Sequence, residues 1–431
     1  MNADQRKEII NLIRREVVPA MGCTEPIAVA LCVARAVELL GSRPEIIHLS
    51  LSGNIIKNAM GVGIPGTGMI GLPIAVALGS LIGKSEYGLE VLKDVTSDAI
   101  EEAKLFIEEG RIRISHNPCP PSILHIEVDT EATDPETGET VSSRAVISGA
   151  HTRFVSLCRN GEELMNIGSL SEDRLEEDEL RLNMKQVYEF AITAPAEEIM
   201  FILEAGMLNK AAAQTALNND YGHSLGSTIR KSGRGLFGDT PLEHMITLTS
   251  AACDARMGGA PISVMSNSGS GNQGITCTLP VISYAEDCAA DSETTARALI
   301  LSHLTSIYIK QSLGPLSGLC GCVVASTGAS AGLAYLMGGG FGEVCASIKN
   351  MVANLAGIIC DGAKPACALK ISSGVSTAVM SAMLAMNGRC VSSAEGIVAE
   401  DIDSTIKNLT DIGREGMKET DKLVLKIMIE K

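Results

Sequence analysis

The chain has 431 residues and a formal net charge of −16; 45% of its residues are hydrophobic and 3% are aromatic. Such a length buries a sizeable core without disulfides, and the acidic balance argues against a nucleic acid partner, because phosphate binding needs clustered Lys and Arg. The 13 cysteines show no regular disulfide spacing, and the N-terminal stretch lacks the long apolar core of a signal peptide. Reduced thiols and a cytoplasmic protein are therefore expected.

The first hundred residues predict helices around one strand. Residues 3–18 are typical of a charged amphipathic helix that ends near Pro19, and a second helix is expected from about Pro26 to Leu40. The segment PEIIHLSLSG indicates a strand, and EVLKDVTSDAIEEAKLFIEEG indicates an amphipathic helix closed by Gly110. With 43 glycines and no Trp, the helices are expected to pack closely.

Alternating segments follow, as in an antiparallel sheet. They are RIRISH, ILHIEVDTEA, SSRAVISG and TRFVSLCRN, with DPETGET as a hairpin turn between two of them. From about residue 176 the pattern is almost wholly helical. We therefore predict an α+β fold, in which a mainly helical domain of residues 1–42 and 170–431 carries the candidate metal-binding cysteines. An inserted α+β subdomain of residues 43–169 contains the antiparallel sheet.

Three stretches, 58–83, 257–285 and 311–342, carry no charged residue and are long enough to span a membrane. The segments GIPGTGMIGLP, SNSGSGNQG and GGGFG interrupt them with turn formers and small polar groups. Buried helices and active-site loops fit this content better, so no membrane association is expected.

Two glycine-rich turns hold cysteines at the ends of apolar runs. LCGCVVASTGASAG contains Cys320 and Cys322, and GIICDGAKPACALK contains Cys360 and Cys367. Three thiolates from these turns could hold a metal or an iron–sulphur cluster, because the small neighbours leave room for a bulky group and for hydrogen bonds to sulphur. The spacing matches neither paired zinc sites nor the ferredoxin run, so from spacing alone buried structural cysteines are the favoured alternative.

The segment MGCTEP places Cys23, Thr24 and Glu25 at the start of the second predicted helix. A thiol at a helix N-terminus is expected to have a lowered pKa, because the helix dipole favours the thiolate. Cys23 is therefore a candidate nucleophile, base or ligand. The alternative is a plain helix cap, with Thr24 as the N-cap and Glu25 in the first turn, and both can hold at once.

The loop SNSGSGNQG gathers small polar groups and backbone N–H groups, a common way to bind a carboxylate or phosphate. As an isolated loop it is equally consistent with a tight turn. GNIIKNAMGVGIPGTG is similar and adds the positive charge of Lys57, while SGAHTRF places His151 at a strand start. The candidate substrate-binding residues are Thr24, Lys57, His151, Asn267, Ser268, Gly269 and Ser270.

Together these segments resemble the L-cysteine desulfidase family, which is related to the alpha chain of iron–sulphur L-serine dehydratases. The matching stretches are MGCTEP, SGNIIKNAMGVGIPGTG, SNSGSGNQGI, GCVVASTGASAG and NMVANLAGIICDGAKPACALK. Five motifs in one order, spread over essentially the whole chain, make the resemblance specific.

The resemblance implies a [4Fe–4S] cluster with three cysteine ligands and one open iron. The matching thiols are Cys320, Cys360 and Cys367, with Cys322 as a rival for Cys320. CDGAKPAC is shorter than the corresponding segment of serine dehydratases, which puts Cys367 in more doubt than Cys360. Cys23 is similar to the essential N-terminal cysteine of desulfidases, as an acid/base or a temporary fourth ligand.

The resemblance implies a lyase that converts L-cysteine to pyruvate, ammonia and sulphide by β-elimination. An open iron would act as a Lewis acid at the leaving group, and Cys23, with Glu25 beside it, would serve as the catalytic acid/base. The alternatives are an L-serine dehydratase and a non-catalytic ligand- or cluster-binding protein of the same fold. The expected partner is a small amino acid, with a homodimer as the candidate assembly. No lysine-centred motif predicts a pyridoxal phosphate site, although Lys57 and Lys370 are formal candidates.

Overall fold

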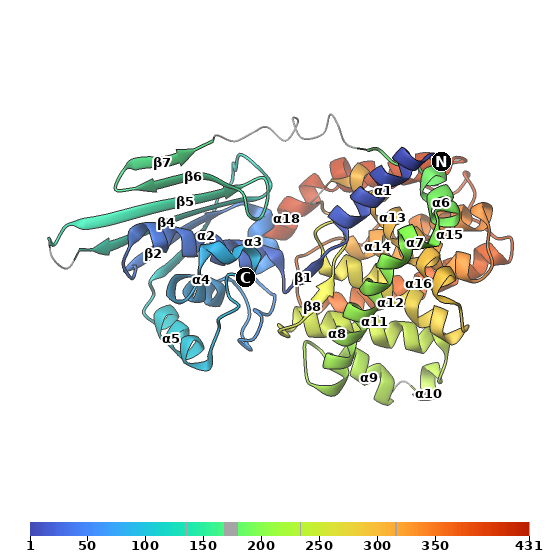
Figure 1. The fold of residues 1–431 in the computed structure, drawn as a ribbon, viewed down its shortest axis with the longest axis horizontal. Coiled ribbons are helices and arrows are strands. Elements are labelled where there is room, and N and C mark those ends of the chain that lie inside the picture. Colours follow the sequence, from blue (N-terminus) through green and yellow to red (C-terminus); the bar gives the residue numbers. More distant parts are fainter. Residues whose placement is uncertain (135–136, 168–179, 233, 315–316, 431) are drawn as a thin grey trace.

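The computed structural model describes residues 1–134, 137–167, 180–232, 234–314 and 317–430. Two bodies lie side by side in Figure 1, a sheet unit built from residues 24–166 and a helical body that contains most of the remaining elements. Helix α18 (Lys418–Ile429) returns from the helical body to the sheet unit and contacts α3 (Gly53–Ala59). The predicted α+β fold class is confirmed.

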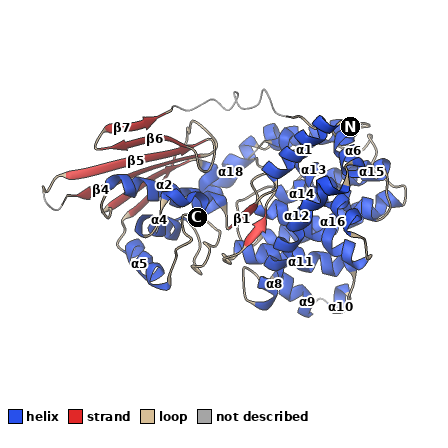
Figure 2. Cartoon of the chain, viewed as in Figure 1, coloured by secondary structure: helices blue, strands red, loops and turns tan. Residues whose placement is uncertain are grey.

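The sheet unit is a six-stranded sheet with helices on one face (Figure 2). The strand order is β3-β2-β4-β5-β6-β7, and all neighbouring pairs are antiparallel except β2 with β3, which makes the sheet mixed. Its strands are β2 (Ile46–Leu51), β3 (Ile112–His116), β4 (His125–Thr133), β5 (Thr140–Ser148), β6 (Phe154–Arg159) and β7 (Glu162–Asn166). Its longer helices are α2 (Thr24–Leu40), α4 (Leu72–Leu81) and α5 (Ser97–Glu108).

Alternation of apolar and polar residues decides which face of the sheet is covered. In β2, Ile47, Leu49 and Leu51 are buried and pack in one core with α2, α4 and α5. The intervening His48 and Ser50 face the opposite side, which forms a polar hollow of about 760 Å³. A period of two is what a half-buried strand requires.

The helical body surrounds α14 (Gly321–Leu336), which packs against α12, α13, α15 and α16. A Cβ placed on Gly328 would lie 2.3 Å from the carbonyl oxygen of Ser302 on α13, so only glycine allows this approach of the two helices. The close packing expected from the small residues is therefore present.

The other helices and strands of the helical body surround α14. They are α1 (Ala3–Glu16), β1 (Pro19–Met21), α6 (Met184–Thr193), α7 (Ala196–Ile199), α8 (Leu203–Asn218), α9 (Leu225–Ser232), α10 (Arg234–Phe237), α11 (Pro241–Met257), β8 (Ser263–Met265), α12 (Gly271–Asp287), α13 (Ser292–Leu313), α15 (Phe341–Leu355), α16 (Cys367–Met386) and α17 (Ile402–Asp411).

Helix α16 is the one helix among the described residues with the length and hydropathy to cross a bilayer, and half of that apolar window is buried inside the protein. It packs on α11, α14 and α15. Its buried half therefore forms part of the core of the helical body.

The hydrophobic cores divide the N-terminal segment differently from the domains expected from sequence. The sequence predicts residues 1–42 as part of the helical domain, but α2 packs on β4, β5 and α4 and belongs to the core of the sheet unit. Its apolar run, TEPIAVALCVARAVELL, has buried residues around most of its circumference and needs a sheet to cover it. Helix α1 remains in the core of the helical body. The expected boundary between residues 169 and 170 lies outside the described residues.

Candidate active site

A cavity of about 680 Å³ lies at the seam between the two bodies, and sequence segments far apart in the chain line it. Ten of the predicted site residues line this cavity: Cys23, Thr24, Glu25, His151, Ser268, Gly269, Ser270, Cys320, Cys360 and Cys367. Lys57 and Asn267 do not. The slightly larger hollow on the open face of the sheet contains none of the predicted site residues, so we take the seam cavity as the candidate site.

Backbone hydrogen bonds join the two cysteine turns. The N–H of Cys320 donates to the carbonyl of Ile358 at 3.0 Å, and the N–H of Cys360 donates to the carbonyl of Gly318 at 2.7 Å. Cys320 is the N-cap of α14 and Cys367 is the first residue of α16, so both thiols stand at helix starts. The chain therefore holds these cysteines on ordered backbone rather than on a free loop.

Thiol contacts in this region raise the pKa values of the cysteines. A hydrogen bond with Cys322, together with burial, raises the pKa of Cys320 to about 12. The hydrogen bond with Cys320 and burial raise the pKa of Cys360, and burial raises that of Cys367. Protonated thiols are the form expected without a metal, since a metal releases these protons when it binds.

Cysteine thiols that converge from two turns are the type of donor that holds an iron–sulphur cluster. A single metal ion needs at least three ligand atoms close together. Among the described residues, no such group within 4.8 Å includes the sulphurs of Cys320, Cys360 and Cys367. A four-iron cluster spreads its metals over a cube and so takes thiolates that stand further apart. Lys310 and Lys370 also line the cavity and would offset the negative charge of bound thiolates. Burial lowers the pKa of Lys310 to about 8, and the Cys360 thiol opposes this shift.

Cys23 is the N-cap of α2, but its predicted lowered pKa was wrong. Burial, followed by the nearby carboxylate of Glu25, raises the pKa of this thiol. The Sγ of Cys23 donates to Oε2 of Glu25 at 3.3 Å, and the amide of Asn58 donates to Oε1 of Glu25 at 3.2 Å. Desolvation thus outweighs the helix dipole. Thr24 is the first residue of the helix rather than its cap, and its hydroxyl donates to Oε2 of Glu25 at 3.4 Å.

His151 enters the cavity from the turn between β5 and β6. Burial lowers the pKa of its imidazole, and the carboxylate of Glu25 acts in the opposite direction. The ring is therefore neutral near pH 7 and can accept a hydrogen bond. No feature of SGAHTRF predicted this contact with the helix start at Cys23.

The loop before α12 contributes three of its four predicted residues. Ser270 is the N-cap of α12, and its hydroxyl accepts from the N–H of Gln273 at 3.4 Å. Asn267 is fully buried instead, and its amide donates to Nδ1 of His303 at 3.0 Å and to the His303 carbonyl at 3.2 Å. Asn267 therefore holds the loop from behind and does not line the cavity.

Lys57 also lies outside the cavity, contrary to its expected role in substrate binding. Its ammonium group is buried and forms an ion pair with Asp421 of α18. Asp421 therefore neutralises the charge of Lys57, and the ion pair connects α3 to α18.

Sequence reasoning missed several residues of the cavity, among them Arg256 and Gln273. Arg256 lies in the last turn of α11, and Gln273 lies in the first turn of α12; each is 4% exposed. One signal was present for Arg256, because it directly precedes the charge-free stretch that contains the predicted anion-binding loop. A lone arginine beside such a stretch is a candidate partner for an anion.

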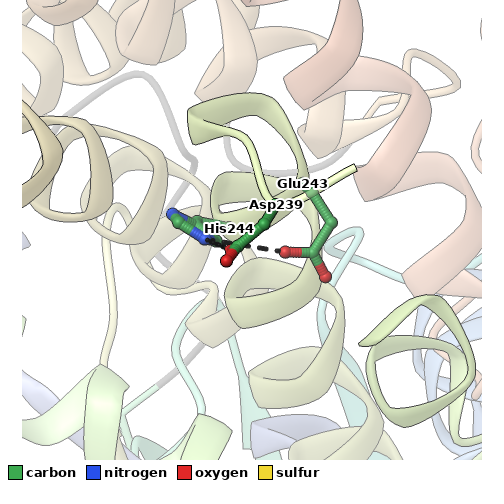
Figure 3. Close-up of side chains that lie close together, drawn as sticks. All are labelled: Asp239, Glu243 and His244. Carbon is green, nitrogen blue, oxygen red and sulfur yellow. Dashed lines mark hydrogen bonds and ion pairs between the residues drawn. The ribbon is translucent and has the colours of Figure 1, made fainter. Parts of the chain in front are cut away.

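A second group of ligand-type side chains lies on the far side of the helical body. Asp239, Glu243 and His244 lie around the start of α11 (Figure 3). Nε2 of His244 lies 2.8 Å from Asp239, while Nδ1 lies 2.9 Å from Asp287. The hydrogen bond with Asp239, and then that with Asp287, raises the pKa of the ring. A protonated imidazole bridging two carboxylates accounts for this geometry without a metal ion.

Comparisons with known proteins show the family of the chain. The model of the family described as serine dehydratase alpha chain matches residues 86–426. The chain is 58% identical over 432 residues to UPF0597 protein BF3560 of Bacteroides fragilis, with all of both chains covered. It is 47% identical over 425 residues to a UPF0597 protein of Oleidesulfovibrio alaskensis, with 98% of this chain and 97% of the relative covered. The chain therefore belongs to the serine dehydratase alpha-chain family.

Proposed function

We propose that this protein is an iron–sulphur-dependent lyase that eliminates the β-substituent of L-cysteine and yields pyruvate, ammonia and sulphide. The observation that carries the proposal is the convergence of Cys23, Cys320, Cys360 and Cys367 on one cavity. A carboxylate and a neutral imidazole lie in the same cavity, as general acid–base chemistry requires. Membership of the serine dehydratase alpha-chain family supports this class of reaction.

Cys320, Cys360 and Cys367 would hold a [4Fe–4S] cluster. When bound, the cluster would supply a Lewis acid for the leaving sulphur or oxygen of the substrate. The cysteine turns join α14 and α16 through backbone hydrogen bonds, so these residues would keep the group against one wall of the cavity. The start of α12 faces the same cavity and would receive the substrate carboxylate.

Cys23 and Glu25 form the proton-handling pair. Oε2 of Glu25 accepts the thiol proton of Cys23 in the hydrogen bond between them. The raised pKa of Cys23 keeps this proton on sulphur at rest, so the thiolate that would remove the α-proton of the substrate forms only when the proton passes to Glu25. The neutral ring of His151 would accept a hydrogen bond from the substrate ammonium group. Aminoacrylate released by the elimination then hydrolyses to pyruvate and ammonia.

L-Serine is the second candidate substrate, because the matching family is described as serine dehydratase. We favour L-cysteine, since a soft thiolate leaving group suits cluster iron better than a hydroxyl does. Action in the cytoplasm without pyridoxal phosphate, nucleic acid or membrane, and assembly as a homodimer, stay predictions.

The test is a comparison of steady-state rates on L-cysteine and L-serine under nitrogen, with iron content measured on the same sample. We expect a higher kcat/KM for L-cysteine, with sulphide and pyruvate formed in equal amounts. A higher value for L-serine would overturn the substrate and leave the lyase standing. No turnover of either amino acid by fully loaded protein would favour a cluster- or ligand-binding protein instead.

A further inference from the structure

Arg256 is a buried cation whose charge is not paired within the described part of the chain. Arg256 is 4% exposed, and among the described residues its hydrogen-bond partners are an amide and a backbone carbonyl rather than a carboxylate. Nη1 donates to Oδ1 of Asn272 at 3.1 Å and Nη2 donates to the carbonyl of Gly22 at 3.0 Å, while Nε has no acceptor. A guanidinium has five N–H donors. Most of the donors, and the charge itself, therefore call for an anion, because a buried unpaired charge is costly.

The start of α12 lies directly against this guanidinium. A Cβ placed on Gly271 would lie 2.3 Å from Nε of Arg256, so glycine is what allows the first turn of the helix to approach. The helix has 17 residues, and its dipole adds partial positive charge at the same place. Ser268 and Ser270 line the same cavity. Arginine, helix start and hydroxyls thus form one anion-binding corner.

Gln273 connects this corner to the cysteine turns. Its side chain is 4% exposed, lines the cavity, and has an Oε1 atom without a hydrogen-bond partner. The side chain of Gln273 packs on Gly321, where a Cβ would lie 3.3 to 3.5 Å from its amide carbon and nitrogen, and Gly321 stands between Cys320 and Cys322. An unpartnered, buried amide at this place needs a polar group from a ligand.

We infer that Arg256 and the start of α12 bind the carboxylate of the substrate, with Gln273 contacting the same molecule on the side of the cysteines. The inference rests on the proposed lyase function for the identity of the substrate. It adds which group of the substrate the protein recognises. The site selects small amino acids by their carboxylate and should discriminate against amines that lack one. Arg256 joins the loop Asn267–Ser270, which the sequence predicts as the donor to the substrate carboxylate, while Asn267 itself does not line the cavity.

The test uses two ligands that differ in the carboxylate. L-Alanine keeps the carboxylate and ammonium groups but has no leaving group, and cysteamine is L-cysteine without its carboxylate. Both are titrated calorimetrically under nitrogen into wild-type protein and Arg256→Gln. We expect the variant to bind L-alanine about 100-fold more weakly, because truncating one partner of a buried charge pair costs this much or more, while its affinity for cysteamine stays unchanged.

The control removes a different arginine, Arg297, which is half-buried and forms an ion pair with Glu293. Arg297 also donates to backbone carbonyls, those of Ala191 and Ile192, and its side chain is 14% exposed, but it does not line the cavity. Arg297→Gln should leave the affinities for both ligands unchanged. If Arg256→Gln does not fold, Arg256→Lys keeps the charge without the planar fork. It should bind L-alanine about tenfold more weakly than wild type with unchanged cysteamine affinity.

Three results would overturn the inference. The first is wild-type protein that does not bind L-alanine, and the second is an Arg256→Gln variant that binds L-alanine as tightly as wild type does. The third is an Arg256→Gln variant that loses affinity for L-alanine and cysteamine equally, which would indicate a purely structural arginine. Arg256-dependent binding of L-alanine by a protein that turns over no amino acid would support the carboxylate site and sink the lyase. Turnover of L-cysteine that does not depend on Arg256 would support the lyase and reject the carboxylate site.

Discussion

The two walls of the cavity are built in different ways. The helical wall presents Cys320, Cys360 and Cys367 from two turns that hydrogen-bond to each other through their backbones. The sheet wall presents Cys23 with Glu25 at a helix start, and His151 from a hairpin turn. In our account the first wall holds a cofactor and the second moves protons. On this proposal, cofactor binding and proton transfer belong to separate bodies and meet only at the cavity between them.

The cores behind the two walls differ as well. Small residues let helices of the helical body approach closely, as Gly328 does at Ser302. The sheet unit relies on alternating Ile, Leu and Val side chains under α2 and α4. Close helix packing gives the cysteine turns a stiff support, whereas the sheet wall depends on how the sheet unit sits on its neighbour.

The largest expected effect follows from removing a thiol of the helical wall. Cys360→Ser should abolish bound iron and visible absorbance in protein purified under nitrogen, and turnover should disappear with them. Cys345→Ser, on α15 and outside the cavity, is the matched control and should keep both. Iron analysis and absorbance spectra provide the measurement. A Cys360→Ser protein that keeps its full iron content would contradict the assignment of this wall.

Removal of a thiol of the sheet wall should lower turnover without loss of iron. Cys23→Ala is expected to retain iron and to lose about 100-fold or more in kcat, as expected for loss of an acid–base group. Cys32→Ala is the control, since Cys32 lies on the same helix but is buried against the sheet, where its thiol donates to the carbonyl of Ala145 at 3.3 Å. Loss of iron in Cys23→Ala would instead make this residue a ligand and remove the distinction between the walls.

The ion pair between Lys57 and Asp421 tests how the C-terminal helix is attached to the sheet unit. Asp421→Asn should lower the free energy of unfolding by about 3 kcal/mol, because it leaves the buried ammonium unpaired. Lys57→Met should cost less, about 1–2 kcal/mol, because the side chain of Asp421 is 25% exposed and water can reach it.

The double variant should be about as stable as Lys57→Met alone, since the unpaired charge is then gone. Lys422→Met, on the exposed side of the same helix, should change stability little. Denaturant unfolding followed by circular dichroism measures all four. Equal losses in the two single variants would show that burial of Lys57 is not what makes the pair matter.

The smallest expected effect concerns His244, far from both walls. Carboxylate contacts raise the pKa of its ring, so its contribution to stability is full below the unfolded pKa of about 6.5 and is lost as pH rises through the folded pKa. His244→Gln should therefore be less stable than wild type near pH 6, and the gap should close at alkaline pH. Thermal unfolding at several pH values checks this. A gap that widens toward alkaline pH would contradict it.

Much of the fold could be predicted from the sequence because its periodicities are local. The strands and the helical remainder follow from spacing alone, but the packing of α2 on the sheet does not, since its apolar surface suits either core. The parallel pairing of β3 with β2 was missed for a related reason. Strand partners are chosen by tertiary contacts, which no single segment records.

Within the site, the sequence indicated the cysteines and the start of α12, and it failed where burial decides. The pKa of Cys23 is raised because desolvation exceeds the effect of the helix dipole, and only the structure shows the depth of burial. Asn267 lies in a loop rich in small polar residues, yet its amide points inward to His303. Arg256 went unnoticed because nothing in its own segment shows that its charge stays unpaired.

Iron binding by the helical wall is the central prediction for this protein. The most direct measurement is the iron and acid-labile sulphide content of wild-type protein purified under nitrogen, with its free thiols counted on the same sample. We predict iron and sulphide in equal amounts, and fewer reactive thiols than after removal of the metal. Protein that contains neither, and takes up neither when supplied with ferrous iron and sulphide while its thiols are reduced, would contradict the account.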